Sequence, residues 1–137
     1  MDIVQYVSQY EPLLHNLIVA QGEDWFDYTL GENRQKYANA LEKSIVYLVI
    51  QDGECVGYVR CVNDFGYGIY IYDLLVHSKV RGNHLGKALM DRVKQDYPND
   101  IVYVMSDVDG YYQKLGYSLE GSIFVVTTDI REQSEQK

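Results

Sequence analysis

The sequence predicts an α+β fold in which a mixed sheet of six to seven strands is flanked by helices. Three apolar segments in a row, 44–50, 54–62 and 69–76, are separated by turn residues, and this order predicts an antiparallel meander. A segment with helical periodicity follows from residue 85 to about 97, and a nearly unbroken apolar run occupies 101–105. Because a helix connects 69–76 to 101–105, we expect these two strands to lie parallel to each other.

The segments before the meander predict one further strand and two helices. Residues 2–7 alternate in polarity, as a strand does. Ser8 and Glu11, with Pro12 near the first turn, indicate the start of a helix. The apolar face of this helix comprises Leu13, Leu14, Leu17 and Ile18. Residues 32–43 repeat the helical spacing and predict the second helix.

The segments after the crossover helix complete the expected sheet. Asp107 or Asp109 can cap a short helix, which Gly116 ends in a left-handed conformation. Residues 117–128 contain two short apolar stretches and predict a final hairpin that turns at Gly121. Exposed final strands offer a surface for a homodimer, and the oligomeric state stays open at this point.

Length and composition indicate one domain, residues 1–137, with 131–137 as a frayed polar tail. The net charge of −8 argues against nucleic acid as a partner, because phosphate backbones need a basic surface, and it suits a cationic substrate. No run of eighteen apolar residues exists, so we expect no membrane span. The N-terminus has no basic region followed by an apolar run, so we expect a cytoplasmic protein.

The two cysteines, Cys55 and Cys61, fall in one predicted strand. Strand alternation places them on the same face, too far apart to form a disulfide within an extended strand. Neither has the spacing of a structural zinc site, so we expect reduced, packed thiols and no metal.

The loop between strand 69–76 and the helix that follows it is the most informative stretch. Gly82 and Gly86 lie in this loop and at the start of the helix. The first turn of a helix has unpaired N–H groups, and its dipole favours an anion. The expected ligand is therefore a phosphate, above all a diphosphate. Arg81 and Lys87 either add positive charge there or belong to the solvated surface.

Two motifs in this region resemble those of the Gcn5-related N-acetyltransferases, the GNAT superfamily. The strand end Leu74-Leu75-Val76 and the loop Arg81-Gly82-Asn83-His84-Leu85-Gly86 are similar to the acyl-CoA loop of that family. Residues 111–117 resemble its later motif, Phe/Tyr-Tyr-x-Lys-Leu-Gly-Phe/Tyr. One position departs, since His84 stands where the family usually has glycine. Its imidazole either touches a phosphate oxygen or faces solvent at the helix start.

The resemblance implies that the chain transfers acetyl from acetyl-CoA to a primary amine by direct attack, with no metal. The pantetheine arm would bond to the main chain of Leu74, Leu75 and Val76, and an N–H near Leu75 or Val76 would hold the oxyanion. The diphosphate would meet the N–H groups of Arg81, Gly82, Asn83, His84, Leu85, Gly86 and Lys87. An alternative with the same fold is a non-catalytic module that binds or senses acyl-CoA.

Two side chains are candidates for proton transfer. Tyr112 matches the family tyrosine that faces the thioester sulfur, where a phenol can protonate the leaving thiolate. The family's usual glutamate base falls at Tyr70, so that base is missing here. Asp73 is the only carboxylate in its strand, and alternation places it opposite Tyr70, Tyr72 and Leu74. Asp73 either acts as a base through water or anchors a neighbouring loop.

An aromatic and acidic stretch near the N-terminus is the candidate acceptor wall. Trp25, Phe26 and Tyr28 alternate with carboxylates, and aromatic faces beside carboxylates suit a cationic amine, small or part of a peptide. In the GNAT fold the region between the first two helices borders the acceptor, and Tyr70 is a further candidate contact. The same aromatic residues are also suited to a purely structural clasp over the core.

Overall fold

The structure is a computed structural model that describes residues 2–106 and 108–128. The chain divides into two compact units, Met1–Met105 and Ser106–Lys137, and each is described by itself. None of the described helices is long and apolar enough to cross a membrane.

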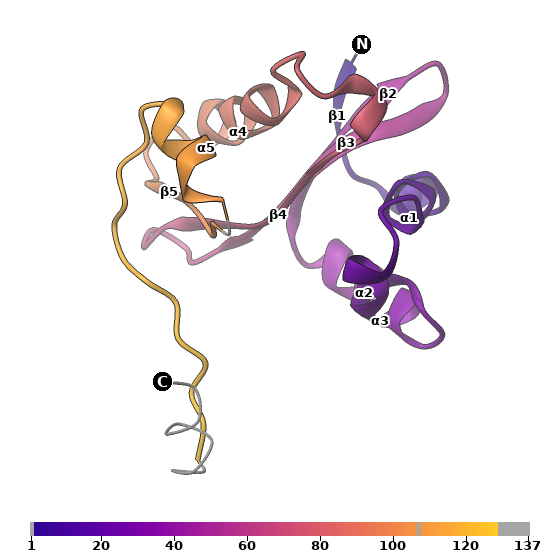
Figure 1. The fold of residues 1–137 in the computed structure, drawn as a ribbon, viewed down its shortest axis with the longest axis horizontal. Helices are drawn as coiled ribbons and strands as arrows, with labels where there is room; N and C mark the ends of the chain where they lie inside the picture. The colour runs from indigo at the N-terminus through magenta and orange to yellow at the C-terminus, as the bar shows by residue number, and fades with distance from the viewer. Residues whose placement is uncertain (1, 107, 129–137) are drawn as a thin grey trace. The chain divides into compact units, whose positions relative to one another are not determined.

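The first unit is built on a five-stranded sheet in the order β1-β2-β3-β4-β5 (Figure 1). β1 (Asp2–Gln5), β2 (Ile45–Gln51), β3 (Glu54–Asn63) and β4 (Ile69–Val76) pair antiparallel, and β5 (Val102–Val104) pairs parallel to β4. The predicted meander and the parallel fifth strand are thereby confirmed. The prediction of six to seven strands is too high for the described residues, because the expected final hairpin is not a pair of strands.

Helices cover both faces of the sheet (Figure 1). α4 (Leu85–Asp96) packs on β2, β3 and β4, whereas α1 (Glu11–Val19) packs on β3 from the other side together with α2 (Phe26–Thr29) and α3 (Asn33–Glu42). α1 and α4 each turn an apolar stripe to the sheet, and burial of that stripe stabilises the helix. The core under α1 and α3 comprises Leu14, Leu17, Ile18, Tyr37, Leu41, Val46, Leu48, Cys55, Tyr58 and Leu75.

β3 contains one extra residue, which reverses the side-chain alternation near its start. Adjacent residues of β2, Val49 and Ile50, pair with Gly57 and Cys55, so Val56 has no partner. This is a β-bulge. The extra residue shifts the alternation, so that two side chains on either side of it that unbroken alternation would place on one face lie on opposite faces of the sheet.

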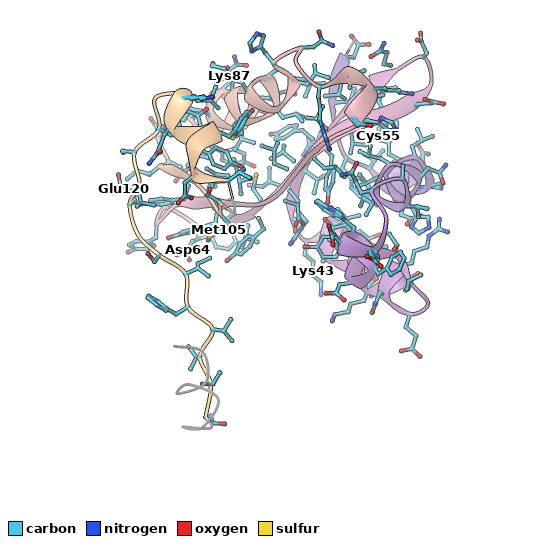
Figure 2. The ribbon with its side chains drawn as sticks, in the orientation of Figure 1. Lys43, Cys55, Asp64, Lys87, Met105 and Glu120 are labelled. Atoms are coloured by element: carbon cyan, nitrogen blue, oxygen red, sulfur yellow. The ribbon has the colours of Figure 1, made fainter. Side chains whose placement is uncertain are left out.

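The bulge separates the two cysteines, and the prediction that they share a face is wrong. Cys55 belongs to the same core cluster as Leu14, between α1 and the sheet, and is labelled in Figure 2. A Cβ on Gly57 would lie 3.5 Å from Leu89 of α4, so Gly57 faces the opposite side. Cys61 follows Gly57 by four residues of regular strand and shares its face. Both thiols are free and buried, as expected.

The second unit contains the short helix α5 (Asp109–Lys114). Gly116 ends it with φ 87°, and the N–H of Tyr117 donates to the carbonyl of Tyr112 at 3.1 Å, a left-handed helix end as predicted. Asp109 lies in the first turn, whereas Asp107 and the tail 131–137 lie outside the described residues. Residues 117–128 are described but form no strand, so the hairpin prediction is wrong for this structure. The apolar side chains of this segment are exposed, among them Ile123, Phe124, Val125 and Val126.

Candidate functional site

The second half of β4 has one free edge. β4 and β5 pair only as far as Ile71, whose carbonyl accepts from the N–H of Met105 at 3.0 Å. On the other side the N–H of His77 donates to Val56 of β3 at 2.8 Å, which makes Val76 and Gly57 a non-hydrogen-bonded pair. The main chain of Val76, and of Leu74 two residues earlier, therefore points away from β3. No described strand pairs with this edge.

A second β-bulge lies where this free edge begins. Arg60 of β3 pairs with Asp73 and Cys61 pairs with Ile71, so Tyr72 is the extra residue of β4. A bulge twists its strand and disrupts the neighbouring ladder. Tyr72 therefore marks the point at which β4 and β5 cease to pair, as the family resemblance implies.

The bulge also corrects the predicted orientation of Asp73. Tyr70 pairs with Val62, which lies on the same face of β3 as Arg60, the partner of Asp73. The Arg60 guanidinium lies 5.8 Å from the ring centre of Tyr72. Tyr70 and Tyr72 therefore share the α1–α3 face with Asp73, because the extra residue shifts the alternation. Of the three residues predicted to lie on the face opposite Asp73, only Leu74 does so.

The loop after β4 presents unpaired amides at the start of α4. A short 3₁₀ turn, Ser78–Val80, precedes it, and Gly82 has φ 88°. Among the hydrogen bonds of residues 2–106 and 108–128, none uses the main-chain N–H of Gly82, Asn83, His84, Leu85 or Gly86, whereas the N–H of Arg81, also predicted to meet the diphosphate, donates to the Ser78 carbonyl at 3.4 Å. Five successive free donors at a helix N-terminus are a site for an anion.

His84 adopts the backbone conformation that favours glycine. Its φ is 59° and its ψ is 25°, in the left-handed region, and it is the N-cap residue of α4 without a side-chain cap. A glycine, the usual family residue at this position, would adopt this conformation without the strain that a Cβ brings. The imidazole is exposed and has no hydrogen-bond partner among the described residues.

The two basic side chains of the loop are already in contact with the protein. Arg81 donates from Nε to the carbonyl of Val76 at 3.1 Å, so it bridges the loop and the end of β4. Lys87 in the first turn of α4, labelled in Figure 2, pairs with Asp91 at 2.7 Å and is about half exposed. Exposed pairs of this kind are weak, so the lysine is able to exchange partners.

Asp73 is the centre of a buried polar cluster on the α1–α3 face. It is 6% exposed. Its Oδ1 accepts from the Tyr28 hydroxyl at 2.7 Å, and its Oδ2 accepts from the Tyr37 hydroxyl at 2.7 Å and from Arg60 Nε at 2.6 Å. Tyr58 shares a 2.7 Å hydrogen bond with Tyr37. Three donors, one of them the Arg60 cation, occupy most of the lone pairs of this carboxylate.

The cluster holds its phenols in the neutral form. Burial and the hydrogen bond to Asp73 raise the pKa of Tyr28 to about 12. Burial and the charge of Asp73 raise the pKa of Tyr37, and burial raises that of Tyr58. Burial alone would lower the pKa of the Arg60 guanidinium, but the hydrogen bond to Asp73 and its negative charge raise that pKa by more. None of these groups is therefore a base at neutral pH.

Aromatic side chains surround this cluster. Tyr28 stacks on Tyr37 with ring centres 4.0 Å apart, and Trp25 meets Tyr28 edge to face at 5.6 Å. Phe26 is 42% exposed and Tyr72 is 47% exposed. The structure thus brings the three predicted wall residues to the same sheet face as Asp73.

Tyr70 belongs to a second aromatic pair on this face. It stacks on Tyr103 of β5 at 4.9 Å, and a Cβ at Gly68 would lie 2.9 Å from Tyr103 and 3.1 Å from Tyr70. Gly68 also has φ 132°, so both space and backbone conformation require glycine there. The position of the family's glutamate is occupied here by a ring that packs against β5.

Comparison with known proteins identifies the family. The model of the acetyltransferase (GNAT) family matches residues 10–117. The chain belongs to the GNAT family. The curated relative "GCN5-related N-acetyltransferase 2, chloroplastic" of Arabidopsis thaliana is 29% identical over 75 residues, 51% of this chain and 29% of the relative. The chain spans less than half the length of the first curated relatives that it matches.

Solved GNAT structures have the same fold. An aminoglycoside acetyltransferase from an uncultured soil metagenomic sample is 24% identical, with a TM-score of 0.71 over 93% of this chain and 98% of that one. An aminoglycoside N-acetyltransferase in complex with CoA is 14% identical, with a TM-score of 0.70 over 93% and 95%. At these identities the likeness concerns the fold.

The GNAT tyrosine position falls in the second unit. Tyr112 is the fourth residue of α5, where its ring meets Tyr111 edge to face at 5.1 Å and stacks on Tyr117 at 6.3 Å. Its role at the thioester sulfur stays a prediction.

Sequence reasoning missed three members of the Asp73 cluster, namely Arg60, Tyr37 and Tyr58. A lone Arg in an apolar strand is a signal that was available, because a buried cation requires a buried carboxylate partner. Tyr37 and Tyr58 gave no such signal, since tyrosine at a core spacing is equally suited to packing.

Proposed function

We propose that this GNAT chain is an N-acetyltransferase that moves acetyl from acetyl-CoA to a primary amine by direct attack. The five unpaired amides from Gly82 to Gly86 carry this proposal, because they offer a seat for the diphosphate of CoA. The free edge of β4 supports it, since an extended pantetheine arm can add to a strand that lacks a neighbour. The likeness to a GNAT structure with bound CoA is consistent with both features.

The free edge also selects between the two candidate oxyanion donors. Leu75 forms a hydrogen-bonded pair with Tyr58, so its main chain faces β3. Val76 faces the free edge, and Arg81 fixes its carbonyl from the loop side. We therefore assign the N–H of Val76 to the carbonyl oxygen of the acetyl group, where it would stabilise the developing negative charge.

The reaction forms one bond and breaks one. The amine nitrogen attacks the acetyl carbon, the carbon–sulfur bond breaks, and the thiolate of CoA takes a proton from the Tyr112 phenol. The protonated amine loses one proton to water before it attacks, and the second proton, released from the nitrogen as the amide forms, returns through water to the Tyr112 phenolate. Cys55 and Cys61 are unsuited to carry the acetyl group, because burial raises the pKa of each thiol to about 12.

Asp73 acts as a positioning residue in this proposal. Its carboxylate is paired with Arg60 and accepts from two phenols, so the lone pairs needed to take a proton from the amine are engaged. A base that acts through water remains the alternative. The Asp73→Asn variant separates the two roles. If Asp73 is a base, the pH–rate profile of the variant should lack its acidic limb, whereas if Asp73 only positions other groups, that limb should remain.

The proposed acceptor is a cationic amine. Trp25, Phe26 and Tyr72 present aromatic faces on the α1–α3 side of the sheet, and Arg60 already lies over Tyr37 and Tyr72 as a cation does over a ring. The exposed carboxylates of Glu23, Asp24 and Asp27 favour positive charge near that wall. Amino sugars, polyamines and peptide N-termini fit this chemistry.

Binding is tested by the thermal midpoint in the presence of CoA and of pantetheine. A ligand at 100 times its Kd stabilises the fold by about 2.7 kcal/mol. We expect CoA to raise the midpoint by several degrees and pantetheine, which lacks the diphosphate, to leave it nearly unchanged. Equal shifts would mean that the loop does not hold the diphosphate, and no shift at millimolar CoA would remove the proposal.

Turnover is tested by release of free thiol from acetyl-CoA across a panel of amines. Tyr112→Phe removes only the phenol proton donor, and general acid catalysis contributes about 10²–10⁴-fold. We expect turnover to fall by at least the lower figure while the CoA-induced midpoint shift is retained. A wild-type chain that binds CoA but acetylates no amine would instead indicate the non-catalytic acyl-CoA module.

A further inference from the structure

We infer that Tyr28 is a positioning residue that fixes the acceptor wall, defined as residues 23–30, against β4 and thereby sets the affinity for the amine. This inference rests on the proposed function for the identity of the wall. Its structural part, a tether from the wall to the sheet, is tested separately below.

The acceptor wall is a unit between two glycines. It consists of the 3₁₀ turn Glu23–Trp25, α2 and Leu30, with Gly22 at φ 88° before it and Gly31 at φ 55° after it. A Cβ on either glycine would meet no atom within 4 Å, so these positions need glycine for their backbone conformation and not for space. The wall is therefore flanked on both sides by a glycine whose φ is positive.

One hydrogen bond joins the wall to the sheet within residues 2–106 and 108–128. The Tyr28 hydroxyl donates to Asp73 Oδ1 at 2.7 Å, across 45 residues of sequence. The other hydrogen bonds of the wall stay within it, reach the flanking Gly22 through the N–H of Trp25, or join it to α3, as the side chain of Asn33 does to the carbonyl of Phe26 at 3.3 Å. Stacking of Tyr28 on Tyr37 orients the phenol for this bond.

The partner of Tyr28 is held rigidly. The second oxygen of Asp73 is engaged by Tyr37 and by the Arg60 ion pair, and Asp73 is buried. Asp73 stands directly after the bulge residue Tyr72 and directly before Leu74, where the free edge proposed for pantetheine runs. The acceptor wall and the free edge of β4 thus share one anchor, Asp73. The distance between the wall and that edge therefore depends on the phenol of Tyr28.

Tyr28→Phe tests the tether, and Tyr47→Phe is its matched control. Tyr47 donates to Asp96 Oδ2 at 2.6 Å, a second phenol–carboxylate bond, on the α4 face of the sheet. A hydrogen bond to a charged group contributes on the order of tenfold or more in an equilibrium. We expect Tyr28→Phe to raise the KM for the amine about tenfold, with kcat within about twofold and the Kd of CoA unchanged. Tyr47→Phe should change none of the three.

Trp25 supplies a readout that does not depend on turnover. It is the only tryptophan of the chain, and it lies 5.6 Å from Tyr28 within the wall. We expect acrylamide to quench its fluorescence more strongly in Tyr28→Phe than in the wild type, and equally in Tyr47→Phe and the wild type. Unchanged quenching in Tyr28→Phe, or an equal rise of KM in both variants, would overturn the inference.

The two readouts keep the inference apart from the proposed function. If the wild type acetylates no amine, the proposed function fails, and the quenching of Trp25 alone decides whether the tether exists. If the wild type is active and the quenching rises without any change in KM, the tether exists but does not set acceptor affinity, and the inference is wrong.

Discussion

The conformation of His84 makes a quantitative prediction about the phosphate loop. A side chain with a Cβ in the left-handed region costs about 1–2 kcal/mol, and His84 has φ 59°. Glycine removes this cost, but it makes the unfolded chain more flexible, which lowers the stability of the fold by about 0.4–1 kcal/mol. We therefore expect His84→Gly to be more stable than His84→Ala by about 0.5–1 kcal/mol, because alanine retains the cost and the exposed imidazole has no partner to lose.

Equilibrium urea denaturation measures this difference. If the free energy of unfolding falls by about 2 kcal/mol per molar urea, the urea midpoint of the glycine variant should be about 0.3–0.5 M higher than that of the alanine variant. An alanine variant as stable as the glycine variant would refute the reasoning, since it would mean that residue 84 is not left-handed in solution.

The same pair of variants decides what the imidazole does. If the main-chain amides alone hold the diphosphate, both variants should bind CoA within about twofold of the wild type. If the imidazole contacts a phosphate oxygen, both should lose about tenfold or more, because a charge-assisted hydrogen bond contributes about 1.5–3 kcal/mol. Titration calorimetry with CoA distinguishes these two results, and neither depends on turnover.

Three further predictions concern stability and reactivity. Arg60→Met leaves a buried carboxylate unpaired and should destabilise the fold by about 3–5 kcal/mol, whereas Arg34→Met, which breaks an exposed pair, should cost under about 1 kcal/mol by the same denaturation assay. Cys55 and Cys61 should not react with a thiol reagent until the protein unfolds, because both are buried with pKa values of about 12; rapid reaction under native conditions would contradict their burial. The raised pKa of Tyr28 contributes stability that is complete below pH 10 and is lost as the pH rises through about 12, so a Tyr28→Phe variant should show a smaller loss of stability over that range.

Local pattern was sufficient for most elements of the first unit. The meander and the crossover helix followed from turn residues and periodicity, and β4 begins and ends where its apolar run does, at Ile69 and Val76. The loop followed from its glycines and from the free amides that every helix start provides. The prediction of the final hairpin failed because short apolar stretches form strands only when another strand pairs with them, which a local sequence pattern does not reveal.

The wrong orientation predicted for Asp73 relative to Tyr70 and Tyr72 has one cause, which is that a bulge is a non-local property. Tyr72 is extra because Arg60 and Cys61 are adjacent in β3 while their partners in β4 are two residues apart, and nothing in β4 alone shows this. The shift brings Tyr70, Tyr72 and Asp73 to one face, whereas regular alternation separates them. The same bulge ends the pairing with β5 and leaves the free edge on which the proposed acyl-CoA site depends. The position where alternation fails is therefore where the aromatic face meets the free edge of β4, and the buried Arg60–Asp73 pair lies directly beside it.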